Sequence, residues 1–355
     1  MQPDLSIRRV LIYRLGSLGD TVVALPCFHL IARVFPNAER RLLTNFPVHA
    51  KAPASAAVLG DSGLVHGYMR YTVGTRNPLE LLRLAAEIRR FRPDVLIYMP
   101  HIRSWKDVQR DQLFFRLAGV RRVVGITGEG EMDFRCDAAT DRYESESMRL
   151  ARLLADLGDA GLEERANWDL VLTDEERRTA AAALAPLSGC PLIVCGPGTK
   201  RQAKDWGEDN WSALLERIGG DYPHHALALV GAKEEFALAE SVARHWSGDK
   251  VNLSDRLSPR EMAAVLEQAT LFLGPDSGPM HVAAAMGVPC VIPFSASTFP
   301  GTWFPHGDQH QVLYHQTSCH GCYLETCTAE RRRCLTSITV EEVAEAVRRV
   351  LGRST

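Results

Sequence analysis

The sequence predicts an α/β fold with two halves, each built around a parallel sheet. Short apolar runs alternate with helical patterns along the chain, and this order is typical of parallel strands joined by helices. At 355 residues the chain exceeds one ordinary domain, which holds roughly 150 residues. Both halves have a Rossmann-like order of elements, so ligands are expected in a central cleft, beyond the carboxyl ends of the strands.

The first half begins with a strand at 10–13 and a helix from Asp20 to Val34, whose apolar residues recur at helical spacing. Pro93 interrupts a later helical pattern just before a new apolar run. The strands expected next are 41–44, 95–99 and 123–126, and the helices are 79–91, 104–117 and 146–157.

A polar, alanine-rich segment at 173–189 connects to the second half and marks the boundary between domains. The strands expected there are 192–195, 226–230, 251–253, 271–273 and 288–294, and the helices are 208–218, 233–246, 259–268, 278–286 and 340–351. The chain is therefore predicted to form a first domain at 1–172, a second at 190–335 and a C-terminal helix within 336–355.

The composition predicts a soluble globular protein. With 46% hydrophobic and 24% charged residues the chain is not of the disordered class, and no apolar run approaches the ~20 residues of a membrane span. Residues 1–9 are polar and lack the apolar core of a secretory signal, so a cytoplasmic location is expected. A net charge of -2 does not favour nucleic acid as a partner, although the arginines Arg89, Arg90 and Arg92 could attract an anionic acceptor. A solvated face is the alternative interpretation of this group.

The loop between the first strand and the first helix has the sequence Arg-Leu-Gly-Ser-Leu-Gly-Asp and ends at Asp20. Gly16 and Gly19 allow a sharp turn and the close approach of a ligand. Asp20 falls in the first helical turn, where the helix dipole favours a negative charge. An ionised aspartate there suits a base that takes a proton from a sugar hydroxyl, but the same position also suits a helix cap. The loop alone leaves both interpretations open.

A second glycine-bearing loop, Gly196 to Trp206, follows a predicted strand and carries several cations. Free backbone amides at Gly198, the Thr199 hydroxyl and the Lys204 ammonium can together hold a diphosphate and neutralise the charge that develops as it leaves. The loop lacks the Gly-Lys-Ser/Thr ending of a Walker A motif, so ATP hydrolysis is disfavoured. An ordinary surface loop with lysines is the alternative interpretation.

A third loop starts an alanine-rich helix after the strand at 271–273. Asp276 can cap that helix or order the loop, while the amides of Ser277 and Gly278 can point at phosphate oxygens or a sugar hydroxyl. His281 lies one turn into the helix and is expected to shape the pocket.

Taken together, these loops resemble those of the ADP-heptose:lipopolysaccharide heptosyltransferases, glycosyltransferase family 9, which have the GT-B fold. The resemblance runs nearly from end to end and rests on four motifs in order. These are RLGSLGD followed by TVVALP (14–26), KDWGEDNW (204–211), LVGAKEE (229–235) and DSGPMHVAAAMGVP (276–289). Gly207 departs from the usual proline of the family, but either residue can begin a helix.

The resemblance implies inverting transfer of heptose from ADP-heptose to a lipopolysaccharide core precursor at the inner membrane face, by a cytoplasmic or membrane-peripheral enzyme. Asp20 would be the base and Lys204 would steady the departing ADP, with the acceptor bound mainly by the first domain and the donor by the second. Glu234 or Glu235 would lie near the ribose. The donor contacts expected are Gly16, Gly19, Gly198, Thr199, Glu234, Asp276, Ser277, Gly278 and His281, and the acceptor contacts are His101 and Arg103.

Metal-independent transfer is expected because the chain contains no Asp-x-Asp triplet, the usual carboxylate pair for a divalent ion on a nucleotide diphosphate. Near the C-terminus, however, four cysteines follow a C-x2-C-x4-C-x6-C pattern, and tetrahedral sulfur coordination suits structural zinc or iron. Some related protein-modifying heptosyltransferases carry a metal in this region, while reduced, unligated thiols are the alternative. The cysteines are Cys319, Cys322, Cys327 and Cys334.

Two other kinds of function are alternatives to heptose transfer onto a lipopolysaccharide core. Within the same chemistry, the chain could use another nucleotide sugar or a protein or other glycan as acceptor. A nucleotide-sugar-binding protein without turnover, or an NAD enzyme, fits less well, because the first loop lacks the Gly-x-Gly-x-x-Gly of dinucleotide binding.

Overall fold

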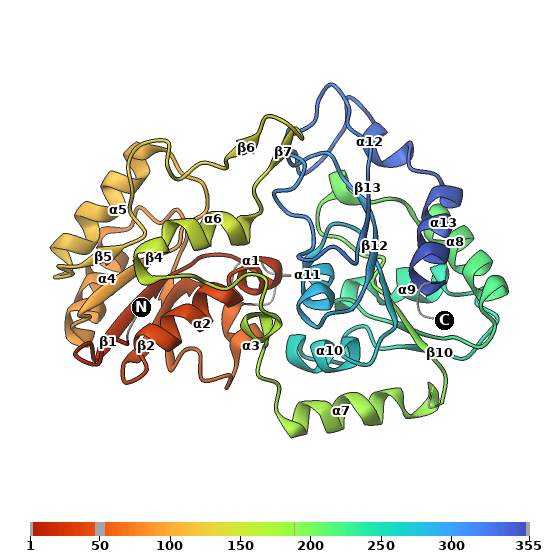
Figure 1. The fold of residues 1–355 in the computed structure, drawn as a ribbon, viewed down its shortest axis with the longest axis horizontal. Coiled ribbons are helices and arrows are strands. Elements are labelled where there is room, and N and C mark those ends of the chain that lie inside the picture. Colours follow the sequence, from red (N-terminus) through yellow and green to blue (C-terminus); the bar gives the residue numbers. More distant parts are fainter. Residues whose placement is uncertain (1–2, 47–53, 188, 353–355) are drawn as a thin grey trace. The chain divides into compact units, whose positions relative to one another are not determined.

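A computed structural model describes residues 3–46, 54–187 and 189–352, which form two compact units (Figure 1). The first unit comprises Met1–Cys136 and Glu144–Val171, and the second comprises Asp137–Tyr143 and Leu172–Thr355. The prediction of an α/β fold with parallel sheets is confirmed in both units. Within the described ranges, no helix is both long enough and apolar enough to cross a bilayer.

The first unit contains a five-stranded parallel sheet in the order β3-β2-β1-β4-β5. Its central strand lies between β2 and β4, so that Tyr13 is opposite both Leu43 and Tyr98. The strands are β1 (Arg9–Tyr13), β2 (Glu39–Asn45), β3 (Gly67–Tyr71), β4 (Val95–Tyr98) and β5 (Val123–Val124). The prediction from sequence missed β3, which lies at the edge of this sheet.

Helices cover both faces of the first sheet (Figure 1). On one face α4 and α5 pack against Leu11 and Tyr13, and on the other α2 contacts α6. The helices of this unit are α1 (Leu18–Val22), α2 (Leu25–Val34), α3 (Ser55–Leu59), α4 (Pro78–Phe91), α5 (Trp105–Leu117) and α6 (Glu146–Leu153).

The single helix predicted from Asp20 to Val34 is wrong in one respect, because the structure has two helices there. Pro26 lies in the first turn of α2, where its missing N–H does no harm. In a continuous helix the same proline would remove a hydrogen bond and clash with the preceding turn. Asp20 therefore belongs to a separate short helix directly after its loop.

The second unit contains a six-stranded parallel sheet in the order β10-β9-β8-β11-β12-β13. Its strands are β8 (Leu192–Cys195), β9 (Ala226–Leu229), β10 (Lys250–Asn252), β11 (Leu271–Leu273), β12 (Cys290–Phe294) and β13 (Gln311–Tyr314). Its helices are α7 (Asp174–Leu184), α8 (Glu208–Asp221), α9 (Phe236–Val242), α10 (Pro259–Leu266), α11 (Gly278–Ala285), α12 (Arg333–Thr336) and α13 (Val340–Leu351). The segment at 173–189, predicted only as a connection, contains α7, whose first turn is fixed by a capping box between Thr173 and Glu176.

The strands β6 (Cys136–Asp137) and β7 (Arg142–Tyr143) form a separate two-stranded sheet. The Tyr143 N–H donates to the Pro300 carbonyl at 2.8 Å, and its ring stacks on Phe299 with centroids 4.6 Å apart. Residues 137–143 therefore belong to the second unit although both flanking segments belong to the first.

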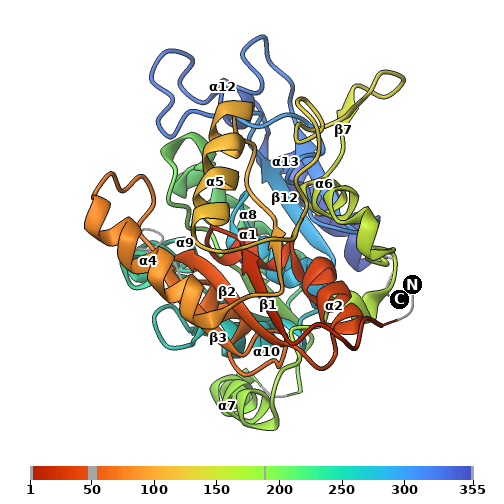
Figure 2. The same ribbon diagram turned by 90° about the vertical axis from the view of Figure 1, so that its left-hand side faces the viewer.

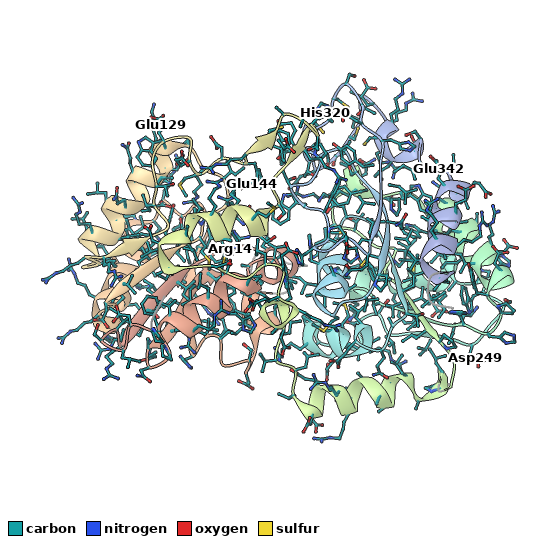
Figure 3. All side chains as sticks on the ribbon, viewed as in Figure 1. Arg14, Glu129, Glu144, Asp249, His320 and Glu342 are labelled. Carbon is teal, nitrogen blue, oxygen red and sulfur yellow. The ribbon has the colours of Figure 1, made fainter. Side chains whose placement is uncertain are left out.

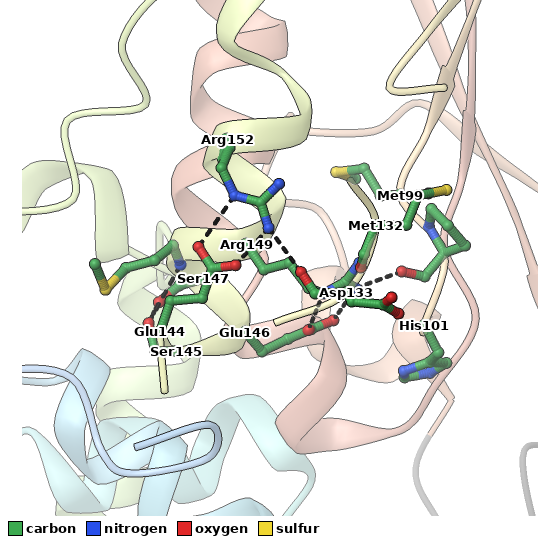
Figure 4. A network of polar contacts seen from close by, with 12 residues as sticks. Met99, His101, Met132, Asp133, Glu144, Ser145, Glu146, Ser147, Arg149 and Arg152 are labelled. Atoms are coloured by element: carbon green, nitrogen blue, oxygen red, sulfur yellow. Dashed lines mark hydrogen bonds and ion pairs between the residues drawn. The ribbon is translucent and has the colours of Figure 1, made fainter. Parts of the chain in front are cut away.

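A buried cluster of charges supports the loop after β1. The Glu146 carboxylate contacts the guanidinium groups of Arg14 at 2.8 Å and Arg149 at 2.7 Å, and all three side chains are at most 2% exposed. Figure 4 shows Glu146 and Arg149 within a wider polar network, and Figure 3 labels Arg14 among the side chains of this unit. Arg14 also donates to the Asp20 carbonyl at 3.0 Å, so the cluster is joined directly to α1.

Replacing Glu146 by glutamine is expected to lower the free energy of unfolding by about 3–5 kcal/mol, because two buried guanidinium charges lose their counter-ion. The matched control Glu175→Gln removes a carboxylate that pairs with Arg178 in an exposed setting, and it should cost less than about 1 kcal/mol. Denaturant unfolding of both variants, followed by circular dichroism, measures the difference.

The contribution of Glu146 to the free energy of unfolding should depend on pH, in a direction that its pKa determines. Burial raises the pKa of the Glu146 carboxyl, but the charges of Arg14 and Arg149 outweigh it and hold the pKa below its usual value of 4.5. The stabilisation is therefore complete above pH 4.5 and is lost as the pH falls below that value. Equal stability of parent and Glu146→Gln at neutral pH would contradict the assignment.

Candidate active site

The loop after β1 holds Asp20 in a geometry that requires glycine at position 16. Gly16 has φ = 138°, a conformation that side chains other than glycine rarely adopt. A Cβ atom there would lie 2.2 Å from the Asp20 Cβ. The Gly16 N–H donates to the Asn45 side chain of β2 at 2.8 Å, which fixes the loop to the sheet. Gly16 thus allows the Asp20 side chain to fold back over the loop.

The two carboxylate oxygens of Asp20 have different surroundings. Oδ2 accepts hydrogen bonds from the Ser17 N–H at 2.7 Å and the Ser17 hydroxyl at 3.1 Å, which forms a capping box at the start of α1. Oδ1 lies 3.6 Å from Nε2 of His101, in the loop after β4. The cap and base interpretations are therefore compatible, because one oxygen caps the helix while the other faces the carboxyl edge of the sheet.

The electrostatic environment keeps Asp20 ionised. Burial raises the pKa of its carboxyl, but His101 and Arg14, followed by the hydrogen bonds from Ser17, outweigh it and lower the pKa below 3.8. Burial together with the Arg14 charge lowers the pKa of His101 below 6.5. At neutral pH the site therefore contains a carboxylate next to a neutral imidazole.

The predicted acceptor residues His101 and Arg103 have different positions. His101 is 38% exposed and faces the Asp20 carboxylate, so a ligand can reach both groups. The Arg103 guanidinium is paired with Asp111 of α5 and lies 5.7 Å from the Tyr13 ring centroid. Arg103 is thus held by its own unit, and a ligand would have to compete with Asp111 for it.

In the second unit, the loop after β8 meets the loop after β11. The Lys204 Nζ lies 2.6 Å from Oδ2 of Asp276, and these side chains are 13% and 3% exposed. Asp276 directly precedes the N-terminus of α11, where the dipole favours negative charge. The structure therefore joins two of the residues predicted from separate loops into one ion pair.

Lys204 is positioned by anchored neighbours on both sides. The Trp206 indole is 1% exposed and donates to the Ile338 carbonyl at 2.9 Å. Ser295 donates to the Ala203 carbonyl at 2.8 Å, and the Cys327 N–H donates to the Gln202 side chain at 2.9 Å. The turn that carries Lys204 is thus attached to β12 and to the cysteine-bearing loop.

The glycine-bearing part of the loop after β8 packs against Glu235. A Cβ atom at Gly198 would lie 2.2 Å from the Glu235 Cδ, so only glycine leaves room for this carboxylate. The Glu235 carboxylate accepts the Ala232 N–H at 2.7 Å, whereas Glu234 is exposed. The sequence left the choice between these glutamates open, and the structure places Glu235 against the loop. The Thr199 hydroxyl accepts the Arg201 N–H at 3.4 Å.

The first turn of α11 combines small residues with a buried hydroxyl and a buried histidine. Ser277 is its N-cap and Gly278 its first residue, and the Ser277 hydroxyl is buried without a hydrogen-bond partner among the described residues. His281 is 6% exposed, and its ring lies edge-on to Trp303 with centroids 6.0 Å apart. The N–H groups and the hydroxyl of this helix start can serve an anionic ligand, while His281 packs behind them.

The four C-terminal cysteines, for which the sequence left a structural metal and unligated thiols as alternatives, form no disulfide bonds in the structure. No group of three or more His, Cys, Asp or Glu residues in the described ranges is arranged to hold a metal ion. The Cys327 sulfur accepts the Arg332 N–H at 3.3 Å, Cys334 lies 3.9 Å from the Ser295 hydroxyl, and Cys319 lies 3.4 Å from the Thr317 hydroxyl. Burial raises the pKa of the Cys334 thiol, and the nearby Cys319 and Cys327 raise it further. The Cys327 N–H also holds the Lys204 turn through Gln202.

Sequence reasoning missed the buried group Arg14 and Glu146. Arg14 belongs to the RLGSLGD motif, but only the glycines and Asp20 were assigned roles. A charged residue directly after an apolar strand was the available signal, because a buried arginine needs a carboxylate partner. Nothing in the sequence pairs it with Glu146, which follows more than a hundred residues later.

One family model and several known proteins are similar to this chain. A family model described as glycosyltransferase family 9 (heptosyltransferase) matches residues 124–332. Lipopolysaccharide heptosyltransferase 1 of Pseudomonas aeruginosa is 27% identical over 348 residues, which cover 90% of this chain and 87% of the relative. Other curated relatives match less completely, and the chain spans about half of the length of several of them.

Two solved structures show the same fold at low sequence identity. A family 9 glycosyltransferase from Veillonella parvula has a TM-score of 0.75 at 16% identity and covers 98% of each chain. The ADP-heptose lipopolysaccharide heptosyltransferase II of Escherichia coli has a TM-score of 0.66 at 16% identity, covering 98% of this chain and 99% of the other. The fold is therefore that of the GT-B heptosyltransferase structures. Since the family model matches more than half of the sequence, this chain belongs to glycosyltransferase family 9.

Proposed function

We propose that this chain is an inverting glycosyltransferase that moves heptose from ADP-heptose to a hydroxyl of a lipopolysaccharide core precursor. The observation that carries the proposal is a side-chain contact at the carboxyl edge of each sheet. Asp20 faces His101 in the first unit, and Lys204 pairs with Asp276 in the second. One contact offers a base with an open oxygen, and the other offers a cation beside a helix N-terminus.

Asp20 is assigned the proton transfer. As the acceptor hydroxyl oxygen forms a bond to the anomeric carbon, its proton passes to Oδ1 of Asp20, because Oδ2 is already occupied by Ser17. The bond between the anomeric carbon and the diphosphate oxygen breaks, and its electron pair leaves with ADP. Attack from the face opposite the leaving group inverts the anomeric configuration.

The lowered pKa of Asp20 constrains the timing of this step. A weakly basic carboxylate cannot remove a proton from a free sugar hydroxyl to any useful extent. The hydroxyl becomes acidic only as its oxygen bonds to carbon, so the proton moves late and the sugar carries positive charge in the transition state. The Asp20 carboxylate then also stabilises that charge.

The second unit is assigned the donor and the first the acceptor. Lys204 and the N–H groups of Ser277 and Gly278 would hold the diphosphate, and Glu235 or its neighbour Glu234 would lie at the ribose. These groups supply the positive charge that a divalent ion supplies in other nucleotide-sugar enzymes, so we propose transfer without a metal. The acceptor would contact His101, and Arg103 after leaving Asp111.

The acceptor class is the less constrained part of the proposal. Another nucleotide sugar, or a protein or other glycan acceptor, would use the same base and the same cation. The lipopolysaccharide core is favoured because similar proteins are lipopolysaccharide heptosyltransferases, and with that acceptor the chain would act in the cytoplasm at the inner membrane face. The mass of the product formed from ADP-heptose separates these acceptors.

Replacing Asp20 by asparagine should reduce transfer by roughly a hundredfold or more, because the amide keeps the shape but is no base. The control is Asp107→Asn in α5. Asp107 lies three residues after the N-cap Ser104, as Asp20 lies three residues after the N-cap Ser17. Both variants weaken a helix start, but only the first removes the proposed base. Release of ADP in the presence of acceptor measures the effect, and comparable rates for the two variants would refute the role.

The pH profile of kcat/KM should have its acidic limb below pH 6.5. Transfer requires Asp20 ionised and His101 neutral, and both lose that state as the pH falls through their lowered pKa values. Activity should therefore be constant from pH 8 down to about pH 6.5 and decline only in more acidic solution. Initial rates across this range test it, and a decline already centred above pH 7 would contradict it.

Replacing Lys204 by methionine should weaken ADP binding by about 10- to 100-fold, since a charge-assisted contact to phosphate is lost. The substitution also leaves the Asp276 carboxylate unpaired and repulsive to the diphosphate. The double variant Lys204→Met/Asp276→Asn should therefore bind ADP more tightly than the single one. Calorimetry measures both, with Lys250→Met as a control lysine of the same unit, and unchanged affinity in Lys204→Met would rule out the phosphate contact.

A further inference from the structure

A groove lies between α4 and α5 on the first unit, and the described residues that line it do not belong to the loop that carries Asp20. Figure 2 shows the two helices that border it. Its volume is about 1010 Å³, and apolar side chains of both helices line it. Leu81 and Leu82 come from α4, and Phe114 and Leu117 come from α5. The lining residues run from Pro78 in the first turn of α4 to Arg92 directly after its end, so the groove extends along the full length of this helix.

Large apolar side chains project beyond this groove into solvent. On α4, Leu79 is 62% exposed and Leu82 is 66% exposed, and on α5, Leu113 and Leu117 are 58% and 62% exposed. Single exposed leucines are ordinary on protein surfaces, but four of them on two adjacent helices beside an apolar groove are not. This face therefore has the composition of a surface that is covered in use.

The cationic residues of the groove have no acidic counterparts. Its lining includes Arg9, Arg89, Arg90 and Arg92, and no aspartate or glutamate is among the described residues that line it. Within the described ranges, none of these arginines forms an ion pair, whereas the nearby Arg110 and Arg122 do. The chain as a whole has a net charge of -2, so the positive charge is a local property of this face.

We propose that the α4–α5 face docks on the surface of an anionic phospholipid bilayer. The exposed leucines would enter the boundary between headgroups and acyl chains, and the arginine guanidinium groups would bind lipid phosphates. Arginine stems can lie along apolar surface while their charged ends reach the headgroups. This inference goes beyond the proposed transfer reaction and does not depend on it, since binding to vesicles needs no sugar donor.

A second copy of the chain is a poorer occupant of the same face. A two-fold symmetric contact with its axis near these arginines would bring the arginines of one groove against those of the other. Like charges directly opposed across an interface are unfavourable, whereas lipid phosphates offer the complementary charge. Charge complementarity therefore favours the bilayer.

Sedimentation of the full chain with vesicles tests the proposal. Binding is expected with vesicles of phosphatidylcholine and phosphatidylglycerol, to be weak with phosphatidylcholine alone, and to decline at high salt. Arg9→Glu/Arg90→Glu should reduce partitioning onto the anionic vesicles at least ~30-fold. The control Arg178→Glu/Arg244→Glu reverses two exposed charges of the second unit and should bind like the parent.

The apolar contribution is tested by Leu82→Asp, which should also reduce partitioning, with Phe236→Asp as the exposed control on α9. Circular dichroism verifies that each variant is folded. Equal binding to neutral and anionic vesicles, no vesicle binding by the parent, or equal losses in groove and control variants would each overturn the proposal. A dimer in analytical ultracentrifugation that Leu82→Asp dissociates would also overturn it, and would assign the face to self-association.

Discussion

The order of strands in the two parallel sheets is the constraint on which the candidate site depends. In each unit the first strand has its next strand in sequence on one side and a later strand on the other, and ligands bind where the order reverses in this way. The loops after β1 and β4 therefore meet, as do the loops after β8 and β11. Asp20 and His101 come from the first pair of loops, and Lys204 and Asp276 come from the second. Each contact joins residues that are far apart in sequence, so it exists only because the sheet forms.

The buried charges of the first unit connect its stability to the chemistry assigned to Asp20. Glu146 neutralises Arg14 and Arg149 in the interior, and Arg14 in turn donates to the Asp20 backbone and lowers the pKa of its carboxyl. An arginine without Glu146 would be too costly to bury at this position. The ion pair formed with α6 thus holds in place one of the charges that lower the pKa of the proposed base. This arrangement explains why a charged residue stands at the end of an otherwise apolar strand.

The elements that were predictable from sequence are those with a strong local pattern. Alternating apolar runs and helices identified both sheets, and glycine-rich loops after strands identified the regions around Asp20, Lys204 and Asp276. Sequence patterns could not reveal pairings across the fold, such as Arg14 with Glu146 or Gly198 with Glu235, because these depend on which loops the sheet order brings together. The spacing of the four cysteines left a structural metal and unligated thiols as alternatives, because ligand spacing does not determine how the sulfurs are arranged in space. Pro26 indicated a break before α2, but the helical spacing of the apolar residues around it favoured a single helix.

The ion pair between Lys204 and Asp276 has a consequence for the proposed reaction cycle. Asp276 is almost completely buried and next to the start of α11, so its carboxylate has little freedom to move, whereas the lysine stem is flexible. Without a donor, Asp276 holds the Lys204 ammonium at the place where the diphosphate would bind. In the proposed cycle, bound ADP-heptose would have to share the ammonium with the carboxylate, which would lower the net gain in affinity. The developing charge on the leaving diphosphate would strengthen the contact during transfer, so the lysine would favour the transition state over the bound substrate. After transfer, competition from Asp276 would assist the release of ADP.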